Sequence, residues 1–196
     1  MVELQHLLPP PVALAQFCAL NPNATPDDFD SLAFRPVKTA VKVALHQEQG
    51  GLCVYCEQTL AATDGQVEHI KPKGGPNGQP ALCFTYTNHA HSCINPKTCG
   101  QKKQSGLLPI EPGPGCNSEW TLSTDGTVEP IAGLTRARNH AVRQTRDMLG
   151  LNADANLVIE RERWLKQVLN ILQQAPNDIQ IFLQQAPYRH ILATVL

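Results

Sequence analysis

The stretches CVYCEQTLAATDGQVEHIKPKG (Cys53–Gly74) and SCINPKTCGQKK (Ser92–Lys103) decide which fold this chain can adopt. They hold two separated cysteine pairs, which are Cys53 with Cys56 and Cys93 with Cys99. Four thiolates in two such knuckles are what a tetrahedral structural zinc needs. The intervening segment is rich in Gly, Pro and Asn and poor in apolar periodicity, so a bound zinc would supply folding free energy, about 10 kcal/mol. We therefore predict a structural Zn²⁺ site formed by these four cysteines.

The sequence leaves alternatives for one of the four predicted zinc ligands. The gap between Cys93 and Cys99 is wider than is usual within a knuckle. Cys83, His89 or His91 is close enough along the sequence to replace one of the four cysteines. A lone cytosolic cysteine is more often a small buried hydrophobic residue.

Composition limits the class of protein. The 196 residues are enough for one sizeable core, in one or two domains. Seven cysteines, an odd number, fit a reducing compartment better than a disulfide framework. The first residues, MVELQHLLPPPV, lack the features of a signal peptide, and no apolar run is long enough to span a bilayer. We expect a cytoplasmic protein.

The chain divides into three parts, which are a proline-rich segment (1–36), a core with the knuckles (37–105) and a hairpin with helices (106–196). Helices are expected at 12–20, 37–49, 100–104, 135–149, 152 or 154 to about 174, 178–185 and 187–194, strands at 66–70 and 82–87, and a hairpin around Asp125-Gly126. The predicted fold class is α+β, with a small zinc-stapled core between an N-terminal helix and a helical C-terminal region. The last part can pack with the core as one domain.

The Glu68-His69 pair lies inside the loop that the zinc would hold. On a regular strand the two side chains would point to opposite faces, unless the chain bends near Pro72. If Glu68 held a divalent ion, His69 could take a proton from water while the ion stabilised the charge that develops on a phosphate. A carboxylate and a histidine in this setting indicate a metal-dependent hydrolase.

Lysines are concentrated around this pair. Residues 69–110 contain five of the eight lysines of the chain and no Asp or Glu. Such a field of one sign indicates a phosphate-bearing polymer as substrate, although a solvated loop is the alternative. The expected nucleic-acid contacts are Lys71, Lys73, Lys102 and Lys103.

Three segments resemble the HNH endonucleases, a family with a ββα-metal motif. They are VEHIKPKG (Val67–Gly74), FTYTNHAHSC (Phe84–Cys93) and CGQKK (Cys99–Lys103), preceded by CVYCE (Cys53–Glu57). Their order is similar to that in the HNH subunits of retron and Septu-type anti-phage systems. The resemblance covers about residues 37–165.

The resemblance implies a role for each matching residue. His69 would be the general base, Glu68 a ligand of a catalytic Mg²⁺ or Mn²⁺, and Asn88 the residue that fixes the loop and orients His69. The four cysteines would hold the structural zinc. The resemblance also implies a nucleic-acid substrate, DNA or RNA, a role in anti-phage defence and an ATPase partner subunit.

The chain departs from the family pattern at Gly100, where many HNH enzymes place a metal-ligating His or Asn directly after the last cysteine. Candidates to replace that ligand are Asn95, His89, His91 and Gln101. The departure keeps a second hypothesis open, a zinc-stapled nucleic-acid-binding or subunit-binding module with a degenerate site. A third, a thiol redox protein using Cys53 and Cys56, would leave Glu68 and the other two knuckle cysteines without a role.

Overall fold

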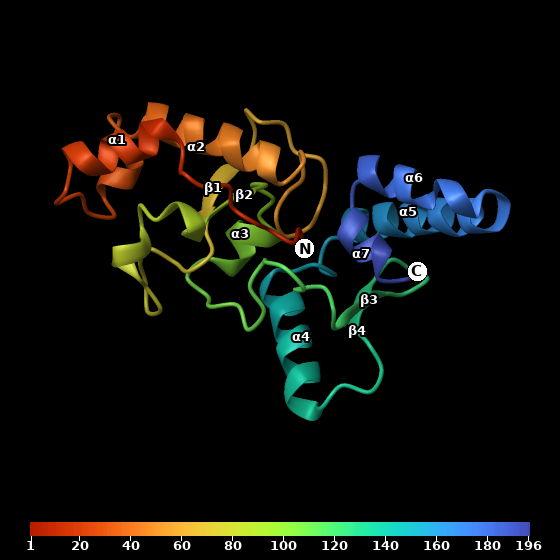
Figure 1. Ribbon diagram of the computed structural model, residues 1–196. Coiled ribbons are helices and arrows are strands. Elements are labelled where there is room, and N and C mark those ends of the chain that lie inside the picture. Colours follow the sequence, from red (N-terminus) through yellow and green to blue (C-terminus); the bar gives the residue numbers. More distant parts are fainter.

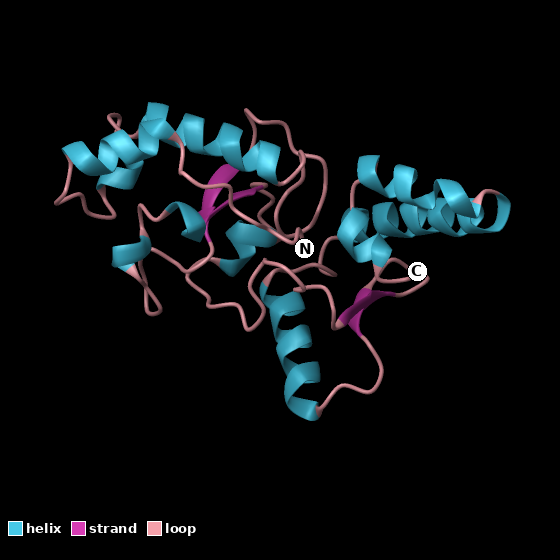
Figure 2. Ribbon diagram, in the orientation of Figure 1, coloured by secondary structure: helices cyan, strands magenta, loops and turns pink.

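The computed structural model describes residues 1–196, and its helices and loops surround two small antiparallel sheets (Figures 1 and 2). Its helices are α1 (Val12–Leu20), α2 (Arg35–Glu48), α3 (Cys99–Lys103), α4 (Arg136–Met148), α5 (Ala155–Gln174), α6 (Ile179–Gln185) and α7 (Arg189–Ala193). Its strands are β1 (Gln66–His69), β2 (His89–Ser92), β3 (Trp120–Leu122) and β4 (Val128–Pro130). The α+β class is therefore confirmed. None of the helices combines the length and apolar content of a membrane span.

Helix α2 covers the sheet that carries the Glu68-His69 pair. Its buried residues Val37, Val41 and Leu45 recur at helical spacing and form one face. That face lies over β1 and β2 (Figure 1). The helix ends where the chain takes positive φ angles at Gly50 and Gly51, a conformation that glycine adopts without a steric penalty. The chain is thereby delivered into the first cysteine knuckle.

Strands β1 and β2 pair antiparallel, with Gln66 opposite Ser92 and His69 opposite His89. The predicted strand at 82–87 is wrong, because this segment lies between and within 3₁₀ turns at Pro80–Leu82 and Tyr86–Asn88. Cys83 and Tyr86 of this segment are buried, and Phe84 is partly buried. The ring of Phe84 packs against Phe34 at 5.3 Å, in a small core beneath α1 and α2.

The predicted C-terminal elements are confirmed, with local signals that explain them. Strands β3 and β4 form the hairpin around Asp125-Gly126. The Thr135 side chain accepts a hydrogen bond from the backbone of Arg138 at the start of α4, and Asp154 caps α5 in the same way. Asn152, the alternative cap, instead binds the backbone of Val128.

The main core joins the two ends of the chain to the first knuckle. Met1, Val2 and Leu4 pack in the same cluster as Cys53, Cys56 and the helices α5, α6 and α7. The N-terminus accordingly lies in the middle of the molecule, between α3 and α7 (Figure 1).

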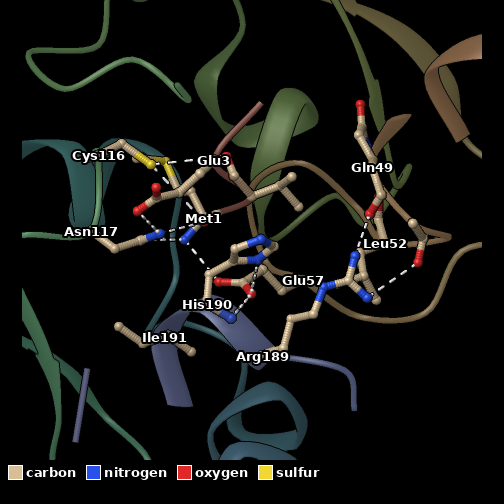
Figure 3. Close-up of polar contacts among 12 residues, drawn as sticks. Met1, Glu3, Gln49, Leu52, Glu57, Cys116, Asn117, Arg189, His190 and Ile191 are labelled. Atoms are coloured by element: carbon tan, nitrogen blue, oxygen red, sulfur yellow. Dashed lines mark hydrogen bonds and ion pairs between the residues drawn. The ribbon is translucent and has the colours of Figure 1, made fainter. Parts of the chain in front are cut away.

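Glu57, the residue after Cys56, is the polar centre of this junction (Figure 3). Its side chain is 1% exposed and lies 2.9 Å from the N-terminal ammonium of Met1. Its other oxygen accepts hydrogen bonds from the backbone N–H of His190 at 2.8 Å and from Nδ1 of the same residue at 2.9 Å. Arg189 donates to the backbone oxygens of Gln49 and Gly50. Helix α7 is therefore hydrogen-bonded to residues on both sides of the first knuckle.

Replacing Glu57 with glutamine should lower the free energy of unfolding by roughly 3–5 kcal/mol at neutral pH, because a buried ion pair loses one partner. Burial alone would raise the pKa of Glu57, but the Met1 ammonium and His190 outweigh burial and lower the pKa to about 2. The pKa of Glu57 is therefore lower in the folded protein than its unfolded value of 4.5. The ionised carboxylate stabilises the fold above that pH, and this stabilisation is lost as the pH falls from about 4.5 towards 2.

Urea unfolding of wild type and Glu57→Gln between pH 7 and pH 3 measures this. The difference between the two proteins is the readout, because acid would weaken metal binding by the knuckle cysteines equally in both. Glu160→Gln, at an exposed pair with Arg163 on α5, is the control and should change stability by less than about 0.5 kcal/mol. If wild type exceeds Glu57→Gln in free energy of unfolding by the same amount at pH 7 and pH 3, the ionised Glu57 is not the source of the extra stability.

Candidate active site and metal centre

The four knuckle cysteines converge on one point. Their sulfur atoms all lie within 4.8 Å of one another. The Sγ atoms of Cys53 and Cys99 are 3.7 Å apart, and those of Cys56 and Cys93 are 4.0 Å apart. A tetrahedral zinc with Zn–S bonds of about 2.3 Å places its sulfurs about 3.8 Å apart. The cluster can therefore hold a metal ion, and its donors and spacing fit zinc.

The three alternative ligands lie elsewhere. Nε2 of His91 is hydrogen-bonded to the backbone oxygen of Asp64, and Nε2 of His89 to that of Cys83. Cys83 belongs to the small core beneath α1 and α2. Cys53 is buried among the other three cysteines of the cluster. Burial disfavours its thiolate, but hydrogen bonds from the other three cysteines lower its pKa well below the usual range.

Glu68 and His69 line the same cavity, which has a volume of about 410 Å³ and no hydrophobic lining residue. Its wall is formed by Glu68, His69, Pro72, Lys73, Gly74, Gly100, Gln101, Gln104 and Ser105. His69 is the last residue of β1, so the regular alternation of side chains between the two faces of the strand ends there. The end of the strand thus brings the neighbouring carboxylate and imidazole to one cavity.

The hydrogen bonds of His69 fix which nitrogen carries its proton. Nε2 lies 3.0 Å from the backbone oxygen of Cys83, which can only accept, so Nε2 is the donor in the neutral ring. Nδ1 has no hydrogen-bond partner in the protein and keeps its lone pair. Burial and the neighbouring His89 lower the pKa of His69 to about 3. The ring is therefore neutral at pH 7, with Nδ1 free to accept a proton.

Asn88 fixes the loop that follows His69. Its Oδ1 accepts from the backbone N–H of Lys71 at 2.8 Å, and its Nδ2 donates to the backbone oxygen of the same residue at 2.9 Å. A second bond from Nδ2 reaches the oxygen of Leu82 at 3.2 Å. Asn88 is 5% exposed, so these bonds are shielded from water. This placement suits the expected role of orienting His69.

Glu68 has two oxygens in different surroundings. Oε1 lies 2.9 Å from Nζ of Lys103, and Oε2 accepts from Nε2 of Gln66 at 3.2 Å. Burial raises the pKa of Glu68, and the nearby Lys103 opposes that rise. Gln101, Gln104 and Ser105 add neutral oxygens to the same cavity. This donor set fits a hard divalent ion that takes its other ligands from water and substrate phosphate, as Mg²⁺ commonly does.

No protein-family model matches the chain. A protein of Vibrio cholerae serotype O1 biovar El Tor, named "Retron Vc95 putative HNH endonuclease", is 40% identical over 202 aligned residues, with 98% of each chain covered. Identity at that level over nearly the whole length of both proteins shows common descent. The chain belongs to the HNH endonuclease family. The resemblance in the sequence is thereby confirmed, and so is the class of enzyme.

In this HNH endonuclease, Gly100 lies against Glu68. A Cβ atom built at position 100 would overlap Oε2 of Glu68, so that the carboxylate would have to move. A metal-ligating side chain at this position would therefore displace the carboxylate. Of the proposed replacements, only Gln101 lines the cavity. Asn95 is not in the lining and donates instead to Asp154, the N-cap residue of α5.

The four lysines expected to contact nucleic acid lie in different environments. Lys102 is exposed on α3. Lys71 lies 4.0 Å from Glu111, and Lys73 pairs with Asp30 at the edge of the cavity. The Lys103 side chain is fully buried against Glu68, which argues against phosphate contact by Lys103. Three of the four lysines thus lie beside an acidic residue from outside the span 69–110, which itself contains no Asp or Glu.

Sequence reasoning missed the contribution of the proline-rich segment to this site. The ring of Phe29 lies 4.5 Å from the His69 ring, and Nζ of Lys73 lies 4.8 Å from the centre of the Phe29 ring. Asp30 binds both Lys73 and Lys38. In the sequence, the stretch TPDDFD (25–30) is part of the proline-rich segment, and nothing local indicated that it would lie against His69.

Proposed function

We propose that this HNH endonuclease hydrolyses nucleic-acid phosphodiester bonds in the cavity formed by Glu68 and His69, with Nδ1 of His69 as the general base. The observation that carries the proposal is the single open nitrogen of a neutral histidine at a polar cavity. Attack on a phosphodiester needs a group that removes a proton from the attacking water. The backbone oxygen of Cys83 keeps the other ring nitrogen protonated, so the lone pair stays on Nδ1.

The remaining residues bind and orient. Oε2 of Glu68 is the oxygen that would hold the divalent ion, Mg²⁺ or Mn²⁺, because Oε1 already pairs with Lys103. When bound, such an ion supplies positive charge that stabilises the developing negative charge on phosphate. Asn88 holds the loop after His69. The exposed Lys102, with the partly paired Lys71 and Lys73, would attract the phosphate backbone without reading bases.

The zinc-stapled core is proposed as a ββα-metal unit formed by β1, β2 and α3. The antiparallel pair followed by a helix that begins at Cys99 supports it. The zinc would connect the start of α3, at Cys99, to Cys93 after β2 and to the first knuckle, with Gly100 and Lys103 beside Glu68. The binding-module alternative loses its main support, because Gly100 is accounted for by the position of the carboxylate. The redox alternative loses support because Cys53 and Cys56 lie in a four-sulfur cluster.

The biological setting is proposed from the relative named as a retron endonuclease. We propose that the chain is the nuclease effector of an anti-phage defence system and that it works with an ATPase partner subunit. The substrate is nucleic acid, either DNA or RNA.

A metal titration of cleavage tests the role of Glu68. With DNA and RNA substrates, Glu68→Gln should need more Mg²⁺ or Mn²⁺ than wild type and should recover part of its activity at high metal concentration, because it removes a ligand and not the base. Zinc content should be unchanged. The control is Glu129→Gln. Glu129 lies on β4 of the hairpin and pairs with Arg146 on α4, so this variant should follow the wild-type metal curve. A Glu68→Gln curve that coincides with wild type would remove Glu68 from the metal site.

A further inference from the structure

The side chain of Lys103 is a buried cation at the centre of the site. Its Nζ lies 2.9 Å from Oε1 of Glu68, 3.0 Å from the backbone oxygen of His69 and 3.3 Å from that of Gln104. Its side chain has no exposed surface, whereas the neighbouring Lys102 is exposed. Two carbonyl oxygens therefore hold the ammonium beside the carboxylate, and it has no route to solvent.

Lys103 leaves the cavity with little net negative charge. Glu68 is the only acidic residue in the lining, and the ammonium neutralises it. The one lysine in the lining itself, Lys73, pairs with Asp30 instead. A dication approaching Glu68 thus meets a neutral pair and a positive charge that stays in place. Charges at such short range interact strongly even at the effective dielectric of a protein surface.

We propose that Lys103 is a positioning residue that keeps the affinity of Glu68 for free divalent ions low, so that the ion is held firmly only together with substrate phosphate. The proposal rests on the proposed role of Glu68 as a metal ligand. Phosphate supplies the negative charge that Lys103 cancels, and Mg²⁺ commonly binds through one carboxylate plus substrate phosphates. Lys103 also fixes Oε1, which leaves Oε2 beside Gly100 as the oxygen available to the ion.

Binding of Mn²⁺ to zinc-loaded protein, followed by electron paramagnetic resonance at about pH 8, tests this. The background is His69→Ala, so that an added oligonucleotide stays intact. Without oligonucleotide, Lys103→Met should bind Mn²⁺ at least about tenfold more tightly than the background, because the repelling charge is gone. Adding an oligonucleotide that wild type cleaves should tighten Mn²⁺ binding in the background much more than in Lys103→Met.

Matched variants separate charge from shape. Lys103→Gln is neutral but can still donate hydrogen bonds, so it should also tighten Mn²⁺ binding, and it serves if Lys103→Met does not fold. Lys103→Arg keeps the charge and should keep the weak affinity. Lys166→Met makes the same charge change at an exposed position of α5, outside the proposed nucleic-acid contacts, and should shift the affinity by less than about twofold, because water screens an exposed charge. Zinc content and melting temperature establish that each variant is folded.

The two ideas fail in different ways. If folded, zinc-loaded Lys103→Met and Lys103→Gln bind Mn²⁺ no more tightly than the background, the proposal for Lys103 is overturned, whatever the role of Glu68. If Glu68→Gln leaves Mn²⁺ binding unchanged even with oligonucleotide, the proposed metal site itself is wrong.

Discussion

His69→Ala should lower cleavage by about 10²- to 10⁴-fold, to below detection in an ordinary assay, because a positioned general base contributes about that much. A zinc ion at the cysteine cluster would need only the thiolates, so zinc content and melting temperature should match wild type. Asn88→Ala should have a milder effect, since Asn88 fixes the loop and does not touch the reacting atoms. Initial rates with Mg²⁺ and Mn²⁺ on DNA and RNA measure the effect.

The control for this experiment is His140→Ala, which removes an exposed histidine from α4 and should leave cleavage unchanged. If wild type is silent alone, the comparison is repeated with the proposed ATPase subunit. Cleavage that survives His69→Ala under conditions where wild type is active would refute the mechanism. The binding-module hypothesis would then become the better one.

Cys56→Ser should abolish cooperative folding. A structural zinc contributes on the order of 10 kcal/mol, which is comparable with the whole stability of a typical domain, about 5–15 kcal/mol. The knuckle residues are part of the main core, together with both ends of the chain, so losing the metal should disrupt more than the knuckle loop. Metal analysis should find about one zinc per wild-type chain. The variant should hold little, and its thermal transition should broaden or disappear.

Cys18→Ser is the matched control, because Cys18 is a partly exposed residue of α1 that lies far from the cluster along the chain. It should keep one zinc and a sharp transition. Removing zinc from wild type with a chelator should reproduce the Cys56→Ser result, and adding zinc back should reverse it. A metal-free wild type that melts with an unchanged transition would show that the cluster is not structural.

Most of the helices could be predicted because their signals are local. Thr135 and Asp154 cap the helices that follow them, and Gly50 and Gly51 end α2 through conformations that depend on a few adjacent residues. The four cysteines were identifiable for a similar reason, since knuckle spacing is a property of the sequence. The zinc cluster then needs only that the two knuckles meet.

The second strand could not be predicted, because pairing is decided by a partner that is distant in the chain. The run at 82–87 satisfied a strand pattern, yet its central aromatic residue, Phe84, packs against Phe29 and Phe34. The strand that pairs with β1 is His89–Ser92 instead, where burial on both faces hides any alternation. Burial alone can be satisfied in several ways, and only the packed structure selects one.

The sequence by itself indicated the four-cysteine cluster, the order of the helices and the proposed Glu68-His69-Asn88 set, because each depends on residue type and short-range spacing. Tertiary structure alone decided how the charges are used. Asp30, Glu111 and Glu68 reach Lys73, Lys71 and Lys103, which turned a uniformly basic span into paired groups and one buried cation. Electrostatic interactions act through space, so the partner of a charged side chain is fixed only when the chain has folded.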